Sequence, residues 1–421
     1  MYLRSIRQQI RNLFKMNTGT IKYDFQCTDC GNTYPAEEIS YLCPECEKGN
    51  VPDQPPAGVL RVIYQYDELR NKIRNFAQLR ESGFLDLLPL KSLDSLPYLR
   101  IGHTPLYEPA PGLFFKDDSQ NPTFSFKDRA SALVSAMAKE KGHETIIAAS
   151  TGNAGSSLAG ICAAQKQKAI IVVPEKAPTA KLTQIIMHGA RIVPVRGTYD
   201  EAFELSAAAT KAFGWYNRNT AYNPFTIEGK KTVSFELFEQ LGCRVSARIF
   251  VPVGDGVIIS GVYKGFEDLL KLGLIDHMPQ IVAVQAEGSD NLVRNLKTDT
   301  FRANESTTLA DSISVDVPRN FNMARQFLEK YDGIGLIVSD QEILEASSEL
   351  AHKYGLFAEP AAAAAYAGCK SFYSGKEKDK LDSDVVLLTG SGLKDTASVK
   401  SILKMPEPIS PDLDELKKLV S

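Results

Sequence analysis

The stretch TIIAASTGNAGSS, residues 145–157, predicts a strand, a glycine-rich turn and a helix in close succession. Its first six residues, TIIAAS, form a short apolar run that is typical of a buried strand. Gly152 and Gly155 allow the backbone to turn tightly and to approach a ligand closely. We expect a helix from Ser156, and the free N–H groups at its start favour an anion.

The regions on either side continue this alternation of short apolar runs and amphipathic stretches. Further strands are predicted at 169–174, 190–195, 248–253, 281–286 and 384–389. Helices are predicted near 178–188 and 199–213, and residues 67–96 are mostly helical in pattern. Strands that are apolar throughout are typical of a parallel sheet covered by helices on both faces. We therefore predict an α/β fold of two lobes, with parallel-rich sheets and a cleft between the lobes.

Two other predicted strands also end in glycine-rich turns. VPVGDGVIISG (251–261) has the order strand, turn, helix, and the N–H groups of its turn suit a phosphate. LLTGSGLKD (387–395) has Thr389 at the end of a strand. One such turn is more often structural than functional, but parallel strands bring their carboxyl ends together. We therefore expect the three turns to meet at one binding site, where Asn153 adds a side-chain donor.

Lys127 is the candidate reactive group, in the segment NPTFSFKDRA (121–130). Helical spacing begins at Phe126, which puts Lys127 in the first turn of a helix. A cation there opposes the helix dipole, and burial by the flanking Phe124 and Phe126 would lower the pKa of the amine further. A Schiff-base lysine needs such a neutral, nucleophilic amine. The alternative is a solvated surface lysine.

Four of the seven cysteines form two C-x-x-C pairs, Cys27 with Cys30 and Cys43 with Cys46, separated by twelve residues. This spacing predicts a tetrahedral, structural Zn²⁺ site in which four thiolates leave no open position. Redox dithiols and a rubredoxin-like iron site are the alternatives. An odd number of cysteines with one tight cluster argues against a disulfide framework and favours a reducing compartment.

Composition narrows the remaining possibilities. A net charge of -3 gives no reason to expect nucleic acid as a partner. No apolar run approaches the roughly 18 residues that span a membrane, so no membrane association is expected. Residues 1–15 hold four basic and no acidic residues, as an organelle transit peptide does. Our interpretation is an ordinary leader and a cytoplasmic protein.

Five motifs, in order, resemble those of the fold-type-II pyridoxal-phosphate (PLP) enzymes, whose fold is that of tryptophan synthase β. They are GHTPL (102–106), NPTFSFKDRA, ASTGNAGSSLA (149–159), NPFTIEGKKT (223–232) and LTGSGLKD (388–395). The combination is most similar to the threonine synthases, over about residues 100–395. NPFTIEGKKT and TGSGLKD point to that branch more than to cysteine synthases or dehydratases.

The resemblance implies a role for each matched residue. Lys127 would form the Schiff base with PLP, Asn153 would bind the 3′-oxygen of the cofactor, and Thr389 would bind the pyridine nitrogen. The loop that would hold the cofactor phosphate consists of Gly254, Asp255, Gly256, Val257 and Ile258. The backbone that would bind the substrate carboxylate consists of Ser150, Thr151, Gly152, Asn153 and Ala154.

The resemblance also implies the activity: conversion of O-phospho-L-homoserine and water to L-threonine and phosphate, by a homodimer. Asp255 departs from the Gly-Asn-x-Gly-Asn phosphate loop of the family, so its side chain is expected to point away or to pair with a cation. Residues 308–320 look partly dehydratase-like. Alternatives are therefore a cysteate synthase-like or serine/threonine dehydratase-like enzyme, and a non-catalytic zinc-ribbon scaffold. Cations available for the substrate phosphate are Lys116, Arg129, Lys181, Arg294 and Arg319.

The predicted organisation has five parts. Residues 1–20 are a leader, 21–50 a zinc-ribbon-like module that binds zinc, and 51–99 a helical linker. Residues 100–144 and 215–405 form the large PLP-binding lobe, and 145–214 the small α/β lobe.

Overall fold

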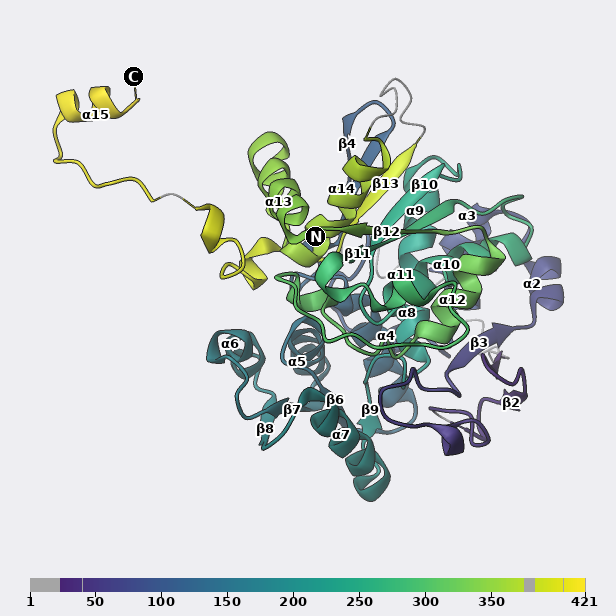
Figure 1. The fold of residues 1–421 in the computed structure, drawn as a ribbon. Helices are drawn as coiled ribbons and strands as arrows, with labels where there is room; N and C mark the ends of the chain where they lie inside the picture. The colour runs from purple at the N-terminus through teal and green to yellow at the C-terminus, as the bar shows by residue number, and fades with distance from the viewer. Residues whose placement is uncertain (1–22, 40, 375–382, 404, 421) are drawn as a thin grey trace, which may run out of the picture.

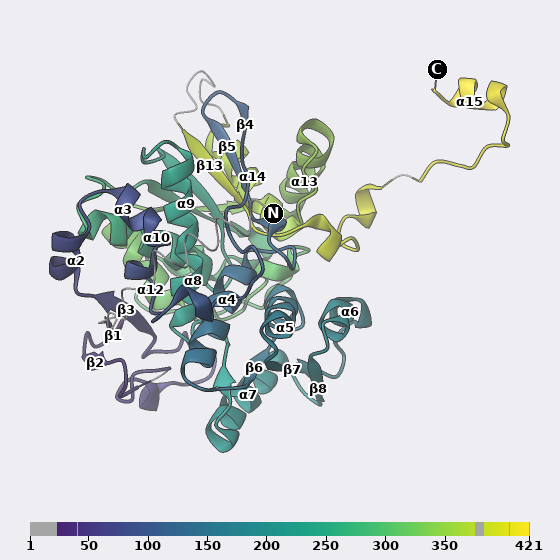
Figure 2. The same ribbon diagram turned by 180° about the vertical axis from the view of Figure 1, so that it is seen from behind.

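The computed structural model describes residues 23–39, 41–374, 383–403 and 405–420 (Figures 1 and 2). The predicted leader lies outside the described residues, as do residues 21, 22 and 40 of the predicted module. The described strands form three sheets of six, four and three strands. No helix among the described residues is long and apolar enough to cross a membrane.

The larger lobe is built on the six-stranded sheet, whose order is β12-β11-β10-β13-β5-β4. All its neighbouring strands are parallel except β4 and β5, which are antiparallel. The strands are β4 (Leu106–Ala110), β5 (Leu113–Asp117), β10 (Arg248–Pro252), β11 (Gln280–Ala286), β12 (Ile334–Val338) and β13 (Asp384–Leu388).

Helices cover both faces of this sheet. Successive residues of a strand point to opposite faces, so each buried strand contributes apolar side chains to both sides. Ile249 and Val251 belong to one apolar core, which they share with α10, while Phe250 belongs to the core shared with α14. One face of the sheet is covered by α10 and by the helices packed around it. These helices are α4 (Lys127–Glu140), α8 (Phe225–Lys230), α9 (Thr232–Gln240), α10 (Val257–Lys271), α11 (Asn291–Asn295) and α12 (Phe321–Lys330). The other face is covered by α14 (Pro360–Phe372), on which α13 (Asp340–Tyr354) packs. The alanine run 361–365 is buried here, since small side chains let α14 lie close to the strands.

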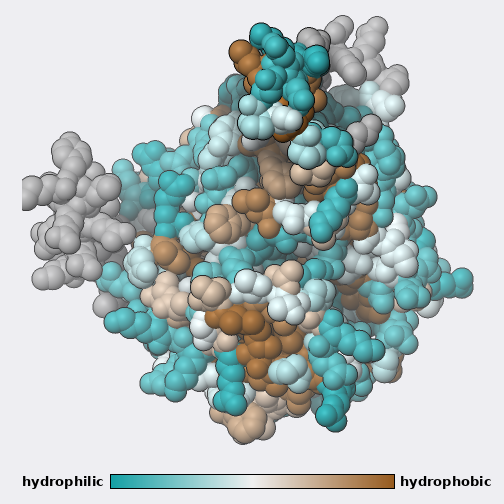
Figure 3. Space-filling view, turned by 90° about the vertical axis from the view of Figure 1, so that its left-hand side faces the viewer, coloured by the Kyte–Doolittle hydropathy of each residue, from teal (hydrophilic) through white to brown (hydrophobic). Residues whose placement is uncertain are grey.

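The smaller lobe has a four-stranded parallel sheet in the order β8-β7-β6-β9. Its strands are β6 (Thr145–Ala149), β7 (Lys168–Pro174), β8 (Arg191–Val195) and β9 (Tyr216–Asn217). Its helices are α5 (Asn153–Gln165), α6 (Thr179–Met187) and α7 (Tyr199–Phe213). The side of the molecule where α6 lies carries an apolar patch (Figure 3), and Met187 of this helix is 80% exposed.

The N-terminal segment forms the three-stranded antiparallel sheet β2-β1-β3. Its strands are β1 (Tyr23–Cys27), β2 (Thr33–Pro35) and β3 (Leu60–Tyr64), and two short helices follow, α2 (Tyr66–Lys72) and α3 (Phe76–Glu81). The predicted helical pattern over 67–96 is interrupted, because Gly83 and Phe84 both adopt a positive φ of 62°. Beyond them lie only short 3-10 turns, at 85–87 and 93–95. The last helix is α15 (Leu413–Val420), which lies away from the body of the molecule (Figures 1 and 2).

Candidate active site

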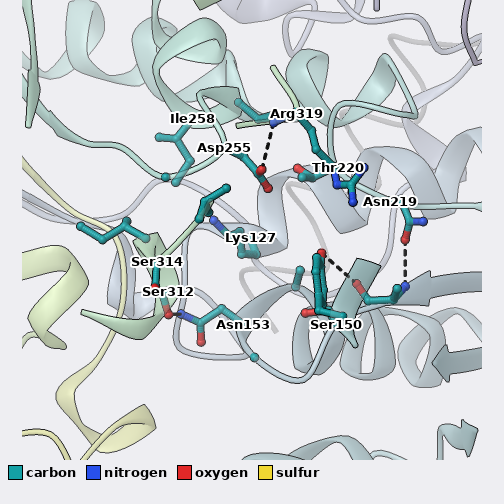
Figure 4. Close-up of a pocket in the computed structure, with 18 of the residues that line it drawn as sticks. Lys127, Ser150, Asn153, Asn219, Thr220, Asp255, Ile258, Ser312, Ser314 and Arg319 are labelled. Atoms are coloured by element: carbon teal, nitrogen blue, oxygen red, sulfur yellow. Dashed lines mark hydrogen bonds between the residues drawn. The ribbon is translucent and has the colours of Figure 1, made fainter. Parts of the chain in front are cut away.

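A cavity of about 550 Å³ lies between the two lobes, where the carboxyl ends of β6, β9 and β10 meet (Figure 4). Its walls are the segments 148–154, 218–220, 252–259 and 311–317, together with Lys127, Thr198, Tyr199, Asp200 and Arg319. Two of the three predicted glycine turns, those after β6 and β10, therefore meet at this cavity.

Lys127 is the first residue of α4 and extends into the cavity between Asp255 and Asn153 (Figure 4). Among the described residues, none accepts a hydrogen bond from its Nζ atom. Burial and, next, the charge of Arg218 lower the pKa of its amine, against the opposing charges of Glu359 and Asp255. Of the two flanking phenylalanines, Phe126 is fully buried and Phe124 is 50% exposed. The backbone of Phe124 has a φ of 66°, which turns the chain just before α4.

The turn after β10 forms an anion cradle at the start of α10. Gly256 is the N-cap residue of α10, with a φ of 82° that L-residues rarely adopt. The N–H groups of Val257 and Ile258 lie in the first helical turn, which has no intrahelical acceptors for them. Gly254 approaches the segment after β11 so closely that an added Cβ would lie 3.0 Å from the Cα of Ile313. This backbone suits the phosphate of the cofactor.

Asp255, the residue that departs from the family pattern, turns its side chain toward the 317–320 segment. Its Oδ1 accepts a hydrogen bond from the backbone N–H of Arg319 at 3.2 Å (Figure 4), and its carbonyl accepts one from Asn320. Burial raises the pKa of its carboxyl, while the charge of Arg319 acts in the opposite direction. The side chain was expected to point away or to pair with a cation; it bonds a backbone donor instead, and no ion pair joins it to a cation among the described residues.

Asn153 begins α5 and donates from Nδ2 to a buried carboxylate, that of Glu359, at 2.9 Å and 3.0 Å. The same atom donates to the hydroxyl of Ser312 at 3.2 Å. Burial raises the pKa of Glu359, although the bond from Asn153 opposes this effect. The helix therefore begins at Asn153, three residues before the predicted Ser156, and neither Glu359 nor Ser312 was predicted.

The loop 150–154, predicted to bind the substrate carboxylate, lines the cavity throughout. Its last residues form the N-terminus of α5, where unpaired N–H groups and the helix dipole favour an anion. Gly155 packs directly against the carbonyl of Ser150, a contact that any side chain would prevent.

Thr389 lies next to the lysine segment, at the end of β13. Its carbonyl accepts a hydrogen bond from the N–H of Phe126 at 2.8 Å, and Ser125 pairs with Gly390. Thr389 is buried and is not one of the residues that line the cavity. The third glycine turn therefore packs against the start of α4 and does not line the cavity, so the expectation that all three turns meet at the site is wrong for this turn.

The five candidate cations for a substrate phosphate differ in whether they line the cavity and in which carboxylates they pair with. Lys116, Arg129 and Arg294 lie outside the cavity lining and bind carboxylates elsewhere. Arg319 lines the cavity and pairs with Asp200. Lys181 pairs with Asp311, another lining residue, at 2.8 Å. Arg218 also lines the cavity and was missed, because no glycine turn or motif marks its position.

The four cysteines of the two C-x-x-C pairs come together at the N-terminal sheet, with all their sulfur atoms within 4.8 Å of one another. The Sγ atoms of Cys27 and Cys46 are 3.7 Å apart, and those of Cys30 and Cys43 are 3.8 Å apart. A tetrahedral zinc site with Zn–S bonds of about 2.3 Å requires sulfur atoms about 3.8 Å apart. The donor set therefore fits a four-thiolate zinc ion.

The fold and the lysine cavity are those of a PLP enzyme of fold type II, and the donors around Lys127 fit this cofactor. Residues 98–391 match a family model described as pyridoxal-phosphate dependent enzyme. The chain belongs to this family, and within it to the threonine synthases, as the following relatives show.

Its relatives include three threonine synthases. That of Methanocaldococcus jannaschii is 35% identical, over 94% of this chain and 98% of the relative. That of Methanosarcina acetivorans is 30% identical over the same shares, 94% and 98%. That of Halalkalibacterium halodurans is 34% identical, over 79% of this chain and 96% of the relative.

Solved structures confirm the fold class. Maize serine racemase has a TM-score of 0.62 and 20% identity, covering 82% of this chain and 99% of its own. A threonine deaminase of Solanum lycopersicum has a TM-score of 0.60 and 22% identity, covering 72% of this chain and 88% of its own. At these identities the likeness concerns the fold alone.

Proposed function

We propose that the chain converts O-phospho-L-homoserine and water to L-threonine and phosphate. The observation that carries the proposal is the setting of Lys127, an amine of lowered pKa in a cavity that also holds two anion-binding helix starts, those of α5 and α10. One helix start serves the cofactor phosphate and the other the substrate carboxylate. The relationship to the threonine synthases supports the choice of substrate.

Lys127 is proposed to hold PLP covalently through its amine. PLP, when bound, supplies the electron sink that stabilises negative charge developing on the substrate. Released from the cofactor, the Lys127 amine accepts and donates protons at Cα, Cβ and Cγ of the substrate. Its lowered pKa suits both directions, because proton transfer is most efficient when the pKa lies near the working pH.

The neighbouring residues are proposed to orient the reactants. Gly254, Asp255, Gly256, Val257 and Ile258 hold the cofactor phosphate, and the backbone of 150–154 holds the substrate carboxylate. Asn153 binds the 3′-oxygen of the cofactor, with Glu359 fixing the orientation of its amide. From the family resemblance we also propose that Thr389, which lies beside the start of α4 and outside the cavity lining, offers its hydroxyl to the pyridine nitrogen and so keeps this nitrogen largely neutral.

The four-cysteine cluster is proposed to bind a structural zinc ion. It holds the N-terminal module together, and all four positions of the ion are occupied by thiolates. From the family resemblance we also propose a homodimer in the cytoplasm. We also propose the division of the chain into the five parts predicted from the sequence.

The assay that tests the proposed function compares substrates with PLP-loaded protein. Phosphate release and threonine formation are measured with O-phospho-L-homoserine. Product formation is measured in three separate reactions, with O-phosphoserine plus sulfite, with L-serine alone and with L-threonine alone. The proposal predicts that only the first gives rapid turnover. Faster turnover with O-phosphoserine and sulfite, or with serine, would instead support the cysteate synthase-like or dehydratase-like alternative, to which the 308–320 stretch also points.

A further inference from the structure

Arg218 is a buried cation in the wall of the cavity, fixed beside the loop 150–154. It follows β9 directly, and its N–H donates to the carbonyl of Ile147 at 2.8 Å. The next residue, Asn219, accepts a hydrogen bond from the N–H of Ala149 at 2.8 Å (Figure 4). These two bonds hold the Arg218 segment against the end of β6, from which the loop 150–154 leaves.

The guanidinium of Arg218 lacks the partners that buried arginines normally have. Its side chain is 1% exposed, and Nε donates to the hydroxyl of Ser131 at 3.1 Å. Nη2 is buried and has no hydrogen-bond partner within the described part of the chain, and no ion pair joins Arg218 to a described carboxylate. Arg129 shows the contrast, since it is equally buried but bonds the carboxylates of Asp118 and Glu236.

An unpaired buried guanidinium is costly, because a charge removed from water needs compensation. Burial accordingly lowers the pKa of Arg218 to about 10. A ligand that brings a negative charge into the cavity would supply this compensation. Guanidinium groups pair with tetrahedral oxyanions such as phosphate through two parallel hydrogen bonds.

The other anions of the reaction already have receptors on the structure. The start of α10 suits the cofactor phosphate, and the start of α5 suits the substrate carboxylate. Arg319 and Lys181 are each paired with an aspartate. Lys230 is buried but does not line the cavity, and its amine donates to the carbonyl of Thr226 at 3.4 Å. The remaining anion is the phosphate ester of the substrate. Lys127 is assigned to the cofactor, and Arg218 is the other lining cation that has no carboxylate partner among the described residues.

We propose that Arg218 is the receptor for the phosphate ester of the substrate and thereby selects phosphorylated over hydroxylated amino acids. This proposal rests on the proposed function. It assigns the discrimination between a threonine synthase and a dehydratase to one side chain that touches the leaving group.

The test measures binding of inorganic phosphate and of L-threonine to PLP-loaded protein, from the change in the cofactor absorbance, and the KM for O-phospho-L-homoserine. In Arg218→Gln, the phosphate Kd and the KM are expected to rise by roughly 10- to 100-fold, as for loss of a hydrogen bond to a charged group. The Kd of L-threonine, which has no phosphate, is expected to change by less than about threefold. Arg218→Lys, which keeps the charge, is expected to recover part of the affinity.

Arg319→Gln is the matched control, because Arg319 lines the same cavity but already has a carboxylate partner. It is expected to alter phosphate binding by less than about threefold. Thermal melting of each variant establishes that it is folded, and Arg218→Lys provides the test if Arg218→Gln does not fold. Unchanged phosphate binding in folded Arg218 variants would overturn the proposal.

Two further outcomes separate the proposals from each other. If Arg218→Gln lowers the affinity for PLP as strongly as that for phosphate, Arg218 serves the cofactor and the inference is overturned. If inorganic phosphate binds in an Arg218-dependent manner while O-phospho-L-homoserine is not turned over, the phosphate receptor stands and the proposed function fails.

Discussion

Lys127 and Arg129 lie two residues apart on α4, yet their surroundings give them opposite properties. Two carboxylates, those of Asp118 and Glu236, bond Arg129 and raise its pKa above that of a free arginine despite its burial. Lys127 has no such bond, and burial lowers its pKa. The first turn of α4 therefore carries both Arg129, a permanent cation that anchors the helix, and Lys127, an amine whose lowered pKa favours the neutral, nucleophilic form.

The residues of the site that could be predicted from the sequence are those that belong to local motifs. Lys127, Asn153 and the turn after β10 lie in short segments whose strand–turn–helix order is visible without any partner. Glu359 is different, because its partner Asn153 is 206 residues away in the sequence. Arg218 could not be recognised from the sequence either, since what distinguishes it is that no carboxylate of the described residues pairs with it in the folded protein.

Gly256 is expected to be essential for cofactor binding, because its φ of 82° shapes the phosphate cradle. Gly256→Ala forces an L-residue into the left-handed region, at a cost of about 1–2 kcal/mol of stability. Its Cβ would also lie 3.0 Å from the Cβ of Ala324, which disturbs the start of α12. Titration with PLP should show a Kd raised by at least about tenfold.

Gly273→Ala is the matched control for this variant. Gly273 has a φ of 73°, and nothing lies within 4 Å of a Cβ added there. It should lose a similar amount of stability and keep the wild-type Kd for PLP. An equal loss of PLP affinity in both variants would show that backbone strain alone, and not the cradle, is responsible.

At the scale of elements, α4 is held in place by its buried ion pairs with Asp118 and with Glu236 of α9. Burial raises the pKa of Glu236, but the charges of Arg129 and Lys116 outweigh it and hold this pKa below the usual value. A carboxyl with a depressed pKa stabilises the fold above its unfolded pKa of about 4.3, and this contribution is lost as the pH falls toward the folded pKa.

Arg129→Met should therefore destabilise the protein by about 3–5 kcal/mol at pH 7, since it removes the cation bound to the buried Asp118 and one of the two cations bound to the buried Glu236. The difference from wild type should shrink as the pH falls below about 4. Arg80→Met is the control, because the Arg80–Glu239 pair is 3.3 Å long with Arg80 54% exposed, and it should cost no more than about 1 kcal/mol. Urea unfolding at several pH values measures both. A pH-independent difference for Arg129→Met would contradict this account of Glu236.

The elements themselves were predictable to different degrees. The strands β6, β7, β8, β10, β11 and β13 each lie within one or two residues of their predicted ranges, and all of them except β8 are buried on both faces over most of their length. The strands β4, β5 and β12 were not predicted. β4 is mostly exposed and contains Pro109, and β12 is only partly buried and contains Gly335, so neither has the continuous apolar run of a central strand. The pairings of β5 with β13 and of β12 with β11 join segments far apart in the sequence, whereas β4 pairs with β5, which follows it directly.

At the scale of the whole molecule, the cysteine module rests on both lobes. The ring of Tyr41 stacks on Tyr222 at 4.7 Å, and Asp29 accepts a hydrogen bond from Asn322 of α12 at 2.8 Å. Leu42, Glu47 and Asn50 of the module also line a second cavity, of about 680 Å³, which shares Arg319 with the first. These residues of the module thus line the neighbouring cavity, and no described residue of the module is part of the lining of the lysine cavity.

Removal of the proposed zinc ion should therefore unfold the module and leave the PLP site largely intact. Hydrogen exchange should rise within residues 23–50 when a chelator is added, because four thiolates without a metal repel or oxidise. The cofactor absorbance should remain. Loss of this absorbance at the same chelator dose would contradict the prediction and show that the two sites unfold together.

The identity of the amine that carries the cofactor can be measured directly. PLP-loaded protein is reduced with borohydride, which fixes the cofactor to its lysine, and the labelled peptide is identified by mass spectrometry. The account predicts a single label on Lys127 and none in Lys127→Ala. Labelling of Lys230 or Lys394, two other lysines whose pKa burial lowers, would contradict it.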